Sequence, residues 1–397
     1  MSTRAEGWSI GEIAQWYNSL EDRWPDIFQG ESLDQYWNWS KQIWYASAGG
    51  KKDQAVFVRS LRAGALKIMR KAVNKCERCP LSMYRMSGRG VLEDGSYMAD
   101  PFVQFGDKQA LVGATSAEIM LVSESPGNFE ARIGNPFTSY QVLAGSVCAY
   151  ECREYENCYN GSSKFPCQPC KPVSLRSSHP ENEVIQIRME RANAVKFPIQ
   201  TVAGILDTIL IKTGLWREAW NGRQVLLEDT NEVNAPRPGS VYLTNVNKCR
   251  SCKPKDNGGL EDTAPSKEEM GACSPYLEAQ IHIIQPKVIV AIGNPAITGL
   301  LGIEKPKVLE NRGNAYPSKY NIPVLVECHP SFIARLTDDK ERENYISHFV
   351  ETMKKAKEVV EGSLTFPWMI TKPISTTGND YPDLSGISFI STFPKGD

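Results

Sequence analysis

The pattern of apolar positions divides the chain into a helical part and an alternating part. After residue 117, four short apolar runs rich in β-branched residues predict buried strands at 118–123, 240–245, 287–292 and 323–327. Longer segments between them predict helices, among them 201–213 and 267–284. Strands that alternate with helices indicate a three-layer α/β/α sandwich around a mainly parallel, four-stranded central sheet.

The flanking segments follow a different pattern. Residues 1–72 are expected to form a helical N-terminal extension, which holds six of the nine tryptophans. These rings favour an aromatic cap packed on the main domain, and a stacking platform for bases is the alternative. The α/β domain is expected at 73–362, interrupted by a cysteine-rich insert at 138–200, and the tail 363–397 is expected to be irregular.

Composition narrows the class of protein. Hydrophobic residues make up 41% and charged residues 23% of the chain, as in soluble globular proteins. The sequence shows neither a long apolar run nor a secretory signal, so we expect no membrane association and a cytoplasmic location. Eleven cysteines without such a signal favour metal ligation over disulfides.

The net charge of −1 is unevenly distributed. Segment 51–90 holds eleven Lys and Arg against Asp53 and Glu77, a net +9, so the remainder carries −10. A local basic stripe is typical of a nucleic-acid footprint, and a solvated helix face is the equal alternative.

Polar and turn-forming residues follow each predicted strand. Glu124 comes after the first strand, Asn245 ends the second, Gly293 follows the third, and His329 comes two residues after the fourth. Open α/β sheets build their sites at the carboxyl ends of parallel strands. We therefore expect the functional site at this edge.

One set of four cysteines is a candidate for binding a metal. The pair Cys76 and Cys79 is by itself compatible with zinc, redox or iron–sulfur chemistry. Together with Cys249, after the second strand, and Cys273, in a predicted helix, it can form a four-thiolate site, with Cys252 as a rival ligand.

These motifs together resemble the iron–sulfur uracil-DNA glycosylases of the family 4 and 5 type. The resemblance rests on Cys76-x-x-Cys79-Pro-Leu, the run from Glu124-Ser-Pro-Gly to Gly134-Asn-Pro-Phe137, Asn245-x-x-Lys-Cys249, Cys273 and His329-Pro-Ser331. It covers about 73–137 and 201–360. It implies a 4Fe–4S cluster held by Cys76, Cys79, Cys249 and Cys273, and DNA as the partner of a monomeric enzyme.

The resemblance also implies roles for individual residues, because breaking an N-glycosidic bond builds positive charge on the sugar and negative charge on the base. Glu130 would orient water and balance the sugar, and His329 would support the departing base. Glu124, Phe137 and Asn245 would bind the flipped base. DNA contacts are expected from Ser125, Pro126, Gly127, Ser331 and Arg335.

The chain departs from the family pattern at two places. The family usually has Gly where Ser123 stands, and about sixty residues are inserted directly after Phe137. Within the insert, the spacing of Cys152, Cys158, Cys167 and Cys170 favours a zinc site, with an iron–sulfur site or free thiols as alternatives.

Three functions follow from these patterns. The first is a monofunctional glycosylase that removes uracil from DNA and leaves an abasic site. The insert motivates a second, the removal of another base, such as a modified cytosine in phage DNA, in a defence role. The third is a DNA-binding protein without catalysis, against which the presence of both Glu130 and His329 argues.

Overall fold

The computed structural model describes residues 7–28, 33–46, 51–82, 117–127, 202–217, 240–254, 256 and 260–369. Its helices are α1 (Ile10–Arg23), α2 (Pro25–Phe28), α3 (Leu33–Ala46), α4 (Lys51–Asn74), α12 (Val202–Lys212), α13 (Lys267–Ile284), α14 (Asn294–Leu301), α15 (Val308–Asn311), α16 (Pro330–Ala334), α17 (Asp339–Glu361) and the 3-10 turn η3 (Pro367–Met369). Its strands are β1 (Ile119–Ser123), β2 (Trp216–Arg217), β3 (Ser240–Asn245), β4 (Cys252–Pro254), β5 (Leu260–Asp262), β6 (Val288–Ile292), β7 (Ala315–Tyr316) and β8 (Val324–Glu327).

The central sheet has the order β2-β3-β1-β6-β8-β7. All neighbouring strands run parallel except β7, which is antiparallel to β8. The predicted α/β sandwich is confirmed, and the four expected strands are the four central ones. The two edge strands extend the sheet to six, and each has two residues, too short to leave a periodic signal.

Side chains alternate between the two faces of the sheet. On β1, Met120 and Val122 join the core that includes α13, α14 and the N-terminal helices, whereas Ile119 and Leu121 join the core of α12, α16 and α17. Because helices cover both faces, the strands are apolar throughout, which is the pattern that made them visible in the sequence.

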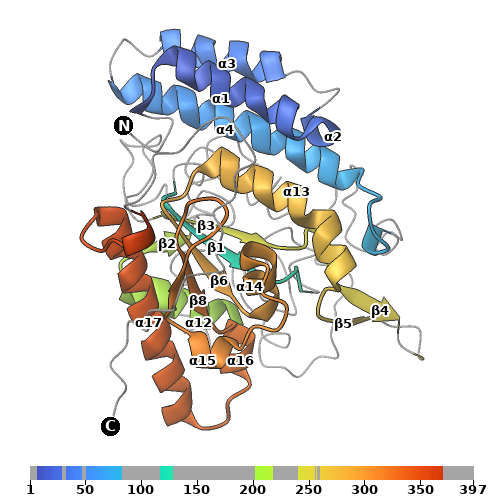
Figure 1. Ribbon diagram of the computed structural model, residues 1–397, viewed down its shortest axis with the longest axis vertical. Helices are drawn as coiled ribbons and strands as arrows, with labels where there is room; N and C mark the ends of the chain where they lie inside the picture. The colour runs from blue at the N-terminus through green and yellow to red at the C-terminus, as the bar shows by residue number, and fades with distance from the viewer. Residues whose placement is uncertain are drawn as a thin grey trace, which may run out of the picture.

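The N-terminal helices form a further layer on the outer side of α13 (Figure 1). The indole of Trp16 is buried there and donates from Nε1 to the carbonyl oxygen of His282 on α13, 3.2 Å away. Trp8, Trp24 and Trp37 pack against the same core. These rings are packing residues, as the cap interpretation proposed. The domain limits at 72 and 362 stay predictions; α4 ends at Asn74 and α17 at Glu361.

Two arginines of the basic segment point into the protein. Arg62 on α4 is fully buried and donates from Nη2 to Gln285 Oε1 at 2.8 Å, and Arg59 is also buried. Arg62 therefore connects α4 to the end of α13, and neither arginine contributes to a surface stripe.

Local signals in the sequence set the limits of α13. Ser266 and Glu269 form a capping box, in which the Ser266 hydroxyl accepts from the Glu269 amide at 3.1 Å and the Glu269 carboxylate accepts from the Ser266 amide at 2.8 Å. At the other end, Gln285 adopts a left-handed conformation and stops the helix. Within the part of the chain that the structure describes, no helix is long and apolar enough to cross a membrane.

Candidate functional site

The carboxyl ends of β1, β3, β6 and β8 meet at one edge of the sheet, as their parallel register requires. The pairing continues past the strand ends, because Val246 and Asn247 donate backbone hydrogen bonds to the carbonyl oxygens of Ser123 and Glu124. The expected strand-end site therefore has a defined scaffold. We call it the strand-end site and define it by Ser123, Asn245, Gly293 and His329.

The imidazole of His329 is held at both nitrogens. Nδ1 accepts from the backbone N–H of Ser331 at 3.0 Å and from its hydroxyl at 2.7 Å. Since a backbone N–H can only donate, Nδ1 carries no proton, and the ring proton lies on Nε2. Nε2–H then donates to Ser123 Oγ at 2.9 Å. Burial, with the charge of Arg335 adding to it, lowers the pKa of His329 to about 4, so the ring is neutral at physiological pH.

His329 reaches across the sheet beside a glycine with a positive φ. Strand β6 lies between β1 and β8, and it ends at Gly293, whose φ is +87°. A Cβ placed there would lie 3.5 Å from the His329 Cβ. That is an ordinary van der Waals distance, so glycine is needed at 293 for its positive φ and not for space, and the imidazole passes over the end of β6 to Ser123.

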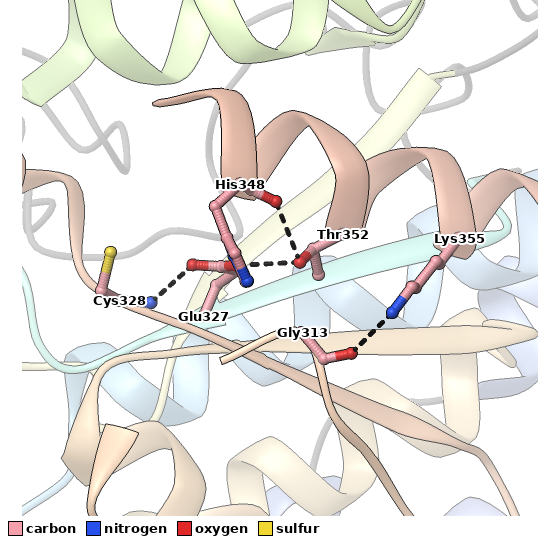
Figure 2. Close-up of polar contacts among 6 residues, drawn as sticks. All are labelled: Gly313, Glu327, Cys328, His348, Thr352 and Lys355. Atoms are coloured by element: carbon pink, nitrogen blue, oxygen red, sulfur yellow. Dashed lines mark hydrogen bonds and ion pairs between the residues drawn. The ribbon is translucent and has the colours of Figure 1, made fainter. Parts of the chain in front are cut away.

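A buried carboxylate fixes the strand end that carries His329. Glu327 is fully buried, and its carboxylate accepts from the backbone N–H of Cys328, His348 Nδ1 and the Thr352 hydroxyl at 2.9, 2.7 and 2.8 Å. Figure 2 shows His348 and Thr352 reaching it from α17. The backbone oxygen of Glu327 also accepts from Gly293 N–H at 2.8 Å. This bracing holds the end of β8 against both β6 and α17.

Asn245 offers an unsatisfied hydrogen-bond donor at the end of β3. Its side chain is buried, and Nδ2 has no hydrogen-bond partner among the residues that the structure describes. Buried polar atoms are nearly always paired, so this atom marks a place where a ligand acceptor fits. The predicted position of Asn245 at the sheet edge is confirmed.

A buried lysine joins the strand-end site to the cysteines. Lys248 Nζ donates to Gln280 Oε1 at 2.6 Å, to Thr244 Oγ1 at 3.2 Å and to the backbone oxygen of Asn245. Its backbone N–H donates to the thiol sulfur of Cys273. Lys248 belongs to the family motif that ends at Cys249, but no role was predicted for it, because a lysine next to a turn usually lies in solvent.

The predicted DNA-contacting residues lie around this edge. Ser125 and Gly127 are half-buried and Pro126 is buried in the turn after β1, and Glu124 beside them has its pKa raised by burial and by Asp262. Arg335 is exposed at the end of α16. The side chain of Ser331 is engaged with His329, so its observed contact is with the imidazole. Their contacts with DNA stay predictions.

The four cysteines expected to act together line one cavity. The space that a water molecule could enter in it is small, about 10 Å³, and its wall includes Cys76, Cys79, Cys249 and Cys273 with Arg78, Lys248 and Tyr276. Cys252 is buried in β4 and lies outside this wall. The rival ligand is therefore not placed with the other four. We call this the cysteine cavity.

Of the four cysteines in the cavity wall, Cys249 and Cys273 are buried, and Cys76 and Cys79 are half-buried. Burial raises the pKa of Cys273 to about 11, and the Coulombic effect of Cys76 and Cys79 raises it further against the lowering effect of Lys248. The Tyr276 hydroxyl hydrogen-bonds to Cys76, and burial raises its pKa too. Among the described residues, no group of three or more His, Cys, Asp and Glu side chains could hold a metal ion. The four thiols instead line the shared wall.

Several predicted residues lie outside the described residues. They are Glu130, Phe137 and the insert cysteines Cys152, Cys158, Cys167 and Cys170. Conversely, three described residues of the site were not predicted as site residues: Ser123, Gly293 and Lys248. A serine at a strand end and a glycine directly after a buried strand were the available signals for the first two.

Known proteins match the α/β part of the chain. The sequence model of the Uracil DNA glycosylase superfamily matches residues 111–354. The Type-4 uracil-DNA glycosylase of Thermotoga maritima is 33% identical over 138 residues, which are 34% of this chain and 65% of that protein. Those of Sulfurisphaera tokodaii and Pyrobaculum aerophilum are 33% and 32% identical over 27% and 28% of this chain, and over 48% and 56% of their own lengths. The chain thus spans about half to two thirds of these relatives.

Proposed function

The chain belongs to the uracil DNA glycosylase superfamily, and from this we propose that it hydrolyses the N-glycosidic bond of uracil flipped out of DNA, leaving an abasic site. The observation that carries the proposal is the fixed Nε2–H of a neutral His329 at the strand-end site. A departing base carries negative charge, and a preorganised donor in a dry site stabilises that charge.

Asn245 supports recognition of the base. An amide can donate and accept on a base edge, and the unsatisfied Nδ2 within the described residues suits a carbonyl acceptor such as uracil presents. We further propose that Glu130 orients the attacking water and that Glu124 and Phe137 bind the flipped base. Ser125, Pro126, Gly127, Ser331 and Arg335 are proposed to contact DNA.

We propose that the cysteine cavity is the place where a 4Fe–4S cluster binds. Four thiols from three separate segments share its wall, and the Lys248 N–H already donates to one sulfur, as amides do around such clusters. Cys76, Cys79, Cys249 and Cys273 would hold the group. When bound, the cluster would cross-link three segments of the chain, which are the loop after α4, the segment after β3 and α13. Zinc in the insert, a monomeric state and a cytoplasmic location belong to the same proposal.

A base-release assay tests the proposal. The protein, purified with its iron retained, is incubated with single-stranded and duplex oligonucleotides that contain one uracil, and alkali-labile sites are counted. We expect release by the wild-type protein and a rate roughly 1,000-fold lower in His329→Gln, since loss of a positioned catalytic group costs on this order.

The fold and DNA binding of His329→Gln are checked by thermal unfolding and by a DNA-binding titration. Release of a modified cytosine alone would establish the second function. Binding of DNA with no release from any substrate would contradict catalysis altogether.

A further inference from the structure

The Ser123 hydroxyl occupies the nitrogen of His329 on which the proposed function depends. Ser123 is the last residue of β1 and is 2% exposed, and its Oγ lies 2.9 Å from His329 Nε2. This hydroxyl accepts the hydrogen bond that Nε2–H donates. The hydroxyl is therefore part of the site.

The direction of this hydrogen bond limits what Ser123 can do. Paired serine and histidine side chains suggest a nucleophile and its base. Here the histidine cannot accept the serine proton, because Nδ1 is filled by the Ser331 N–H and Nε2 already carries the ring proton. The low pKa of His329 agrees with a neutral ring that donates. Ser123 is thus an acceptor from His329 and not an activated nucleophile.

A hydroxyl that accepts one hydrogen bond can still donate its own proton. Within the residues that the structure describes, His329 and no other side chain hydrogen-bonds to Ser123 Oγ. Accepting from Nε2–H also polarises the O–H bond and makes it a stronger donor. In a site this dry, such a donor is worth far more than in water.

We propose that Ser123 is a leaving-group residue, whose hydroxyl accepts from His329 Nε2–H and donates to the carbonyl oxygen of the departing base. The inference rests on the proposed glycosylase function and adds a residue to it. No covalent bond forms at Ser123 and no proton is transferred. The base leaves with the electron pair of the N-glycosidic bond, and the two aligned hydrogen bonds stabilise the resulting anion.

Two variants remove the hydroxyl with different bulk, Ser123→Ala and Ser123→Gly. Ser363→Ala is the matched control, since Ser363 lies beyond α17 and its hydroxyl donates to the Glu358 carbonyl oxygen. We expect single-turnover release of uracil to slow by roughly 100-fold in both Ser123 variants, the usual cost of one such donor. The affinity for DNA should stay close to that of the wild-type protein, and Ser363→Ala should match the wild-type rate.

A second substrate separates a leaving-group role from a structural one. Fluorine withdraws electrons, so 5-fluorouracil departs as a more stable anion than uracil and depends less on a hydrogen-bond donor. The defect of both Ser123 variants should therefore be clearly smaller with 5-fluorouracil. Damage to the fold or to DNA binding would slow both substrates by the same factor.

The outcomes are distinguishable. Equal defects with the two bases, an unchanged rate, or faster release without the hydroxyl would each overturn the role of Ser123 and leave the glycosylase function standing. A wild-type protein that releases neither base would overturn the proposed function, and the role of Ser123 with it.

Discussion

The strand-end site and the cysteine cavity lie at the two ends of one short segment, 245–249, yet they are organised differently. Asn245 begins the segment in the strand-end site, and Cys249 ends it in the wall of the cavity. In the strand-end site, His329, Ser123 and Ser331 are hydrogen-bonded to one another. In the cavity, the four cysteines share one wall, and burial raises the pKa of Cys273.

The two regions differ in whether the protein alone fixes their geometry or a bound group is needed. The polar groups of the strand-end site hold their geometry through the protein alone, as preorganised catalysis requires. Under the proposed function, the thiols of the cavity would gain their main stabilisation from the cluster that binds them as thiolates. Changes in the cavity should therefore act chiefly on stability, and changes at the strand ends chiefly on the reaction.

The largest expected effect comes from the cavity. Cys273→Ser should lose the iron and lower the unfolding free energy by roughly 4 kcal/mol or more, since loss of a bound metal belongs to the most costly single changes. Iron analysis, the visible absorption of the protein and denaturant unfolding measure this.

The matched control is Cys252→Ser, a buried cysteine outside the cavity wall. It should keep its iron. Iron loss in Cys252→Ser as large as that in Cys273→Ser would restore Cys252 as a ligand, and retention of iron by Cys273→Ser would contradict the assignment of Cys273.

The second largest effect is expected at Gly293, where a substitution tests whether the backbone conformation affects stability alone or base release as well. Gly293 has φ +87° and ψ 166°, a region that only glycine adopts readily. We expect Gly293→Ala to cost about 2 kcal/mol of stability and to slow base release about tenfold, because relief of the backbone strain displaces His329.

Gly302→Ala provides the comparison. Gly302 ends α14 at φ +72°, and an added Cβ would have nothing within 4 Å. Its stability should fall by about 1 kcal/mol with an unchanged rate of release. If Gly293→Ala lost stability but released base at the wild-type rate, the placement of His329 over Gly293 would have no catalytic role.

The smallest expected effect is a pH dependence of stability that arises at His282, outside both regions. His282, between Trp16 and Trp24, has its pKa lowered to about 3 by burial and by Arg23. Its folded pKa lies below its unfolded value of 6.5, so its contribution to stability is complete above pH 6.5 and falls as the pH drops toward 3.

Between pH 7.5 and 5.5, the wild-type protein should lose about 1 kcal/mol more unfolding free energy than His282→Gln, from about 1.4 kcal/mol per pH unit. Denaturant unfolding at both pH values measures it. Equal losses in the two proteins would show that His282 protonates freely in the folded state.

The sequence predicted the regular elements better than the contacts between them. Continuous apolar runs located the four central strands to within one residue, and the helix predicted at 267–284 coincides with α13. The hydrogen bond between His329 and Ser123 joins residues separated by 206 positions, across the end of a third strand. No local pattern encodes such a bond.

The cysteines illustrate the same limit. Their identities and order indicated a four-thiolate site, but the choice between Cys252 and Cys249 depended on where β4 places its side chain. Burial of Lys248 could not be read from composition, because the acceptors that stabilise its ammonium come from Thr244 and from Gln280 on α13. Glu130, Phe137 and the insert cysteines remain predictions from the sequence.

The strand order has a consequence for how this chain tolerates change in length. Strand β1 is central, yet both its neighbours, β3 and β6, come later in the chain. The connection from β1 to α12 therefore sets neither the pairing nor the register of β1. Because the entropy of closing a loop grows only with the logarithm of its length, this connection can lengthen at little energetic cost. The topology thus provides a place where new segments enter beside the base site while the sheet that builds the site is preserved.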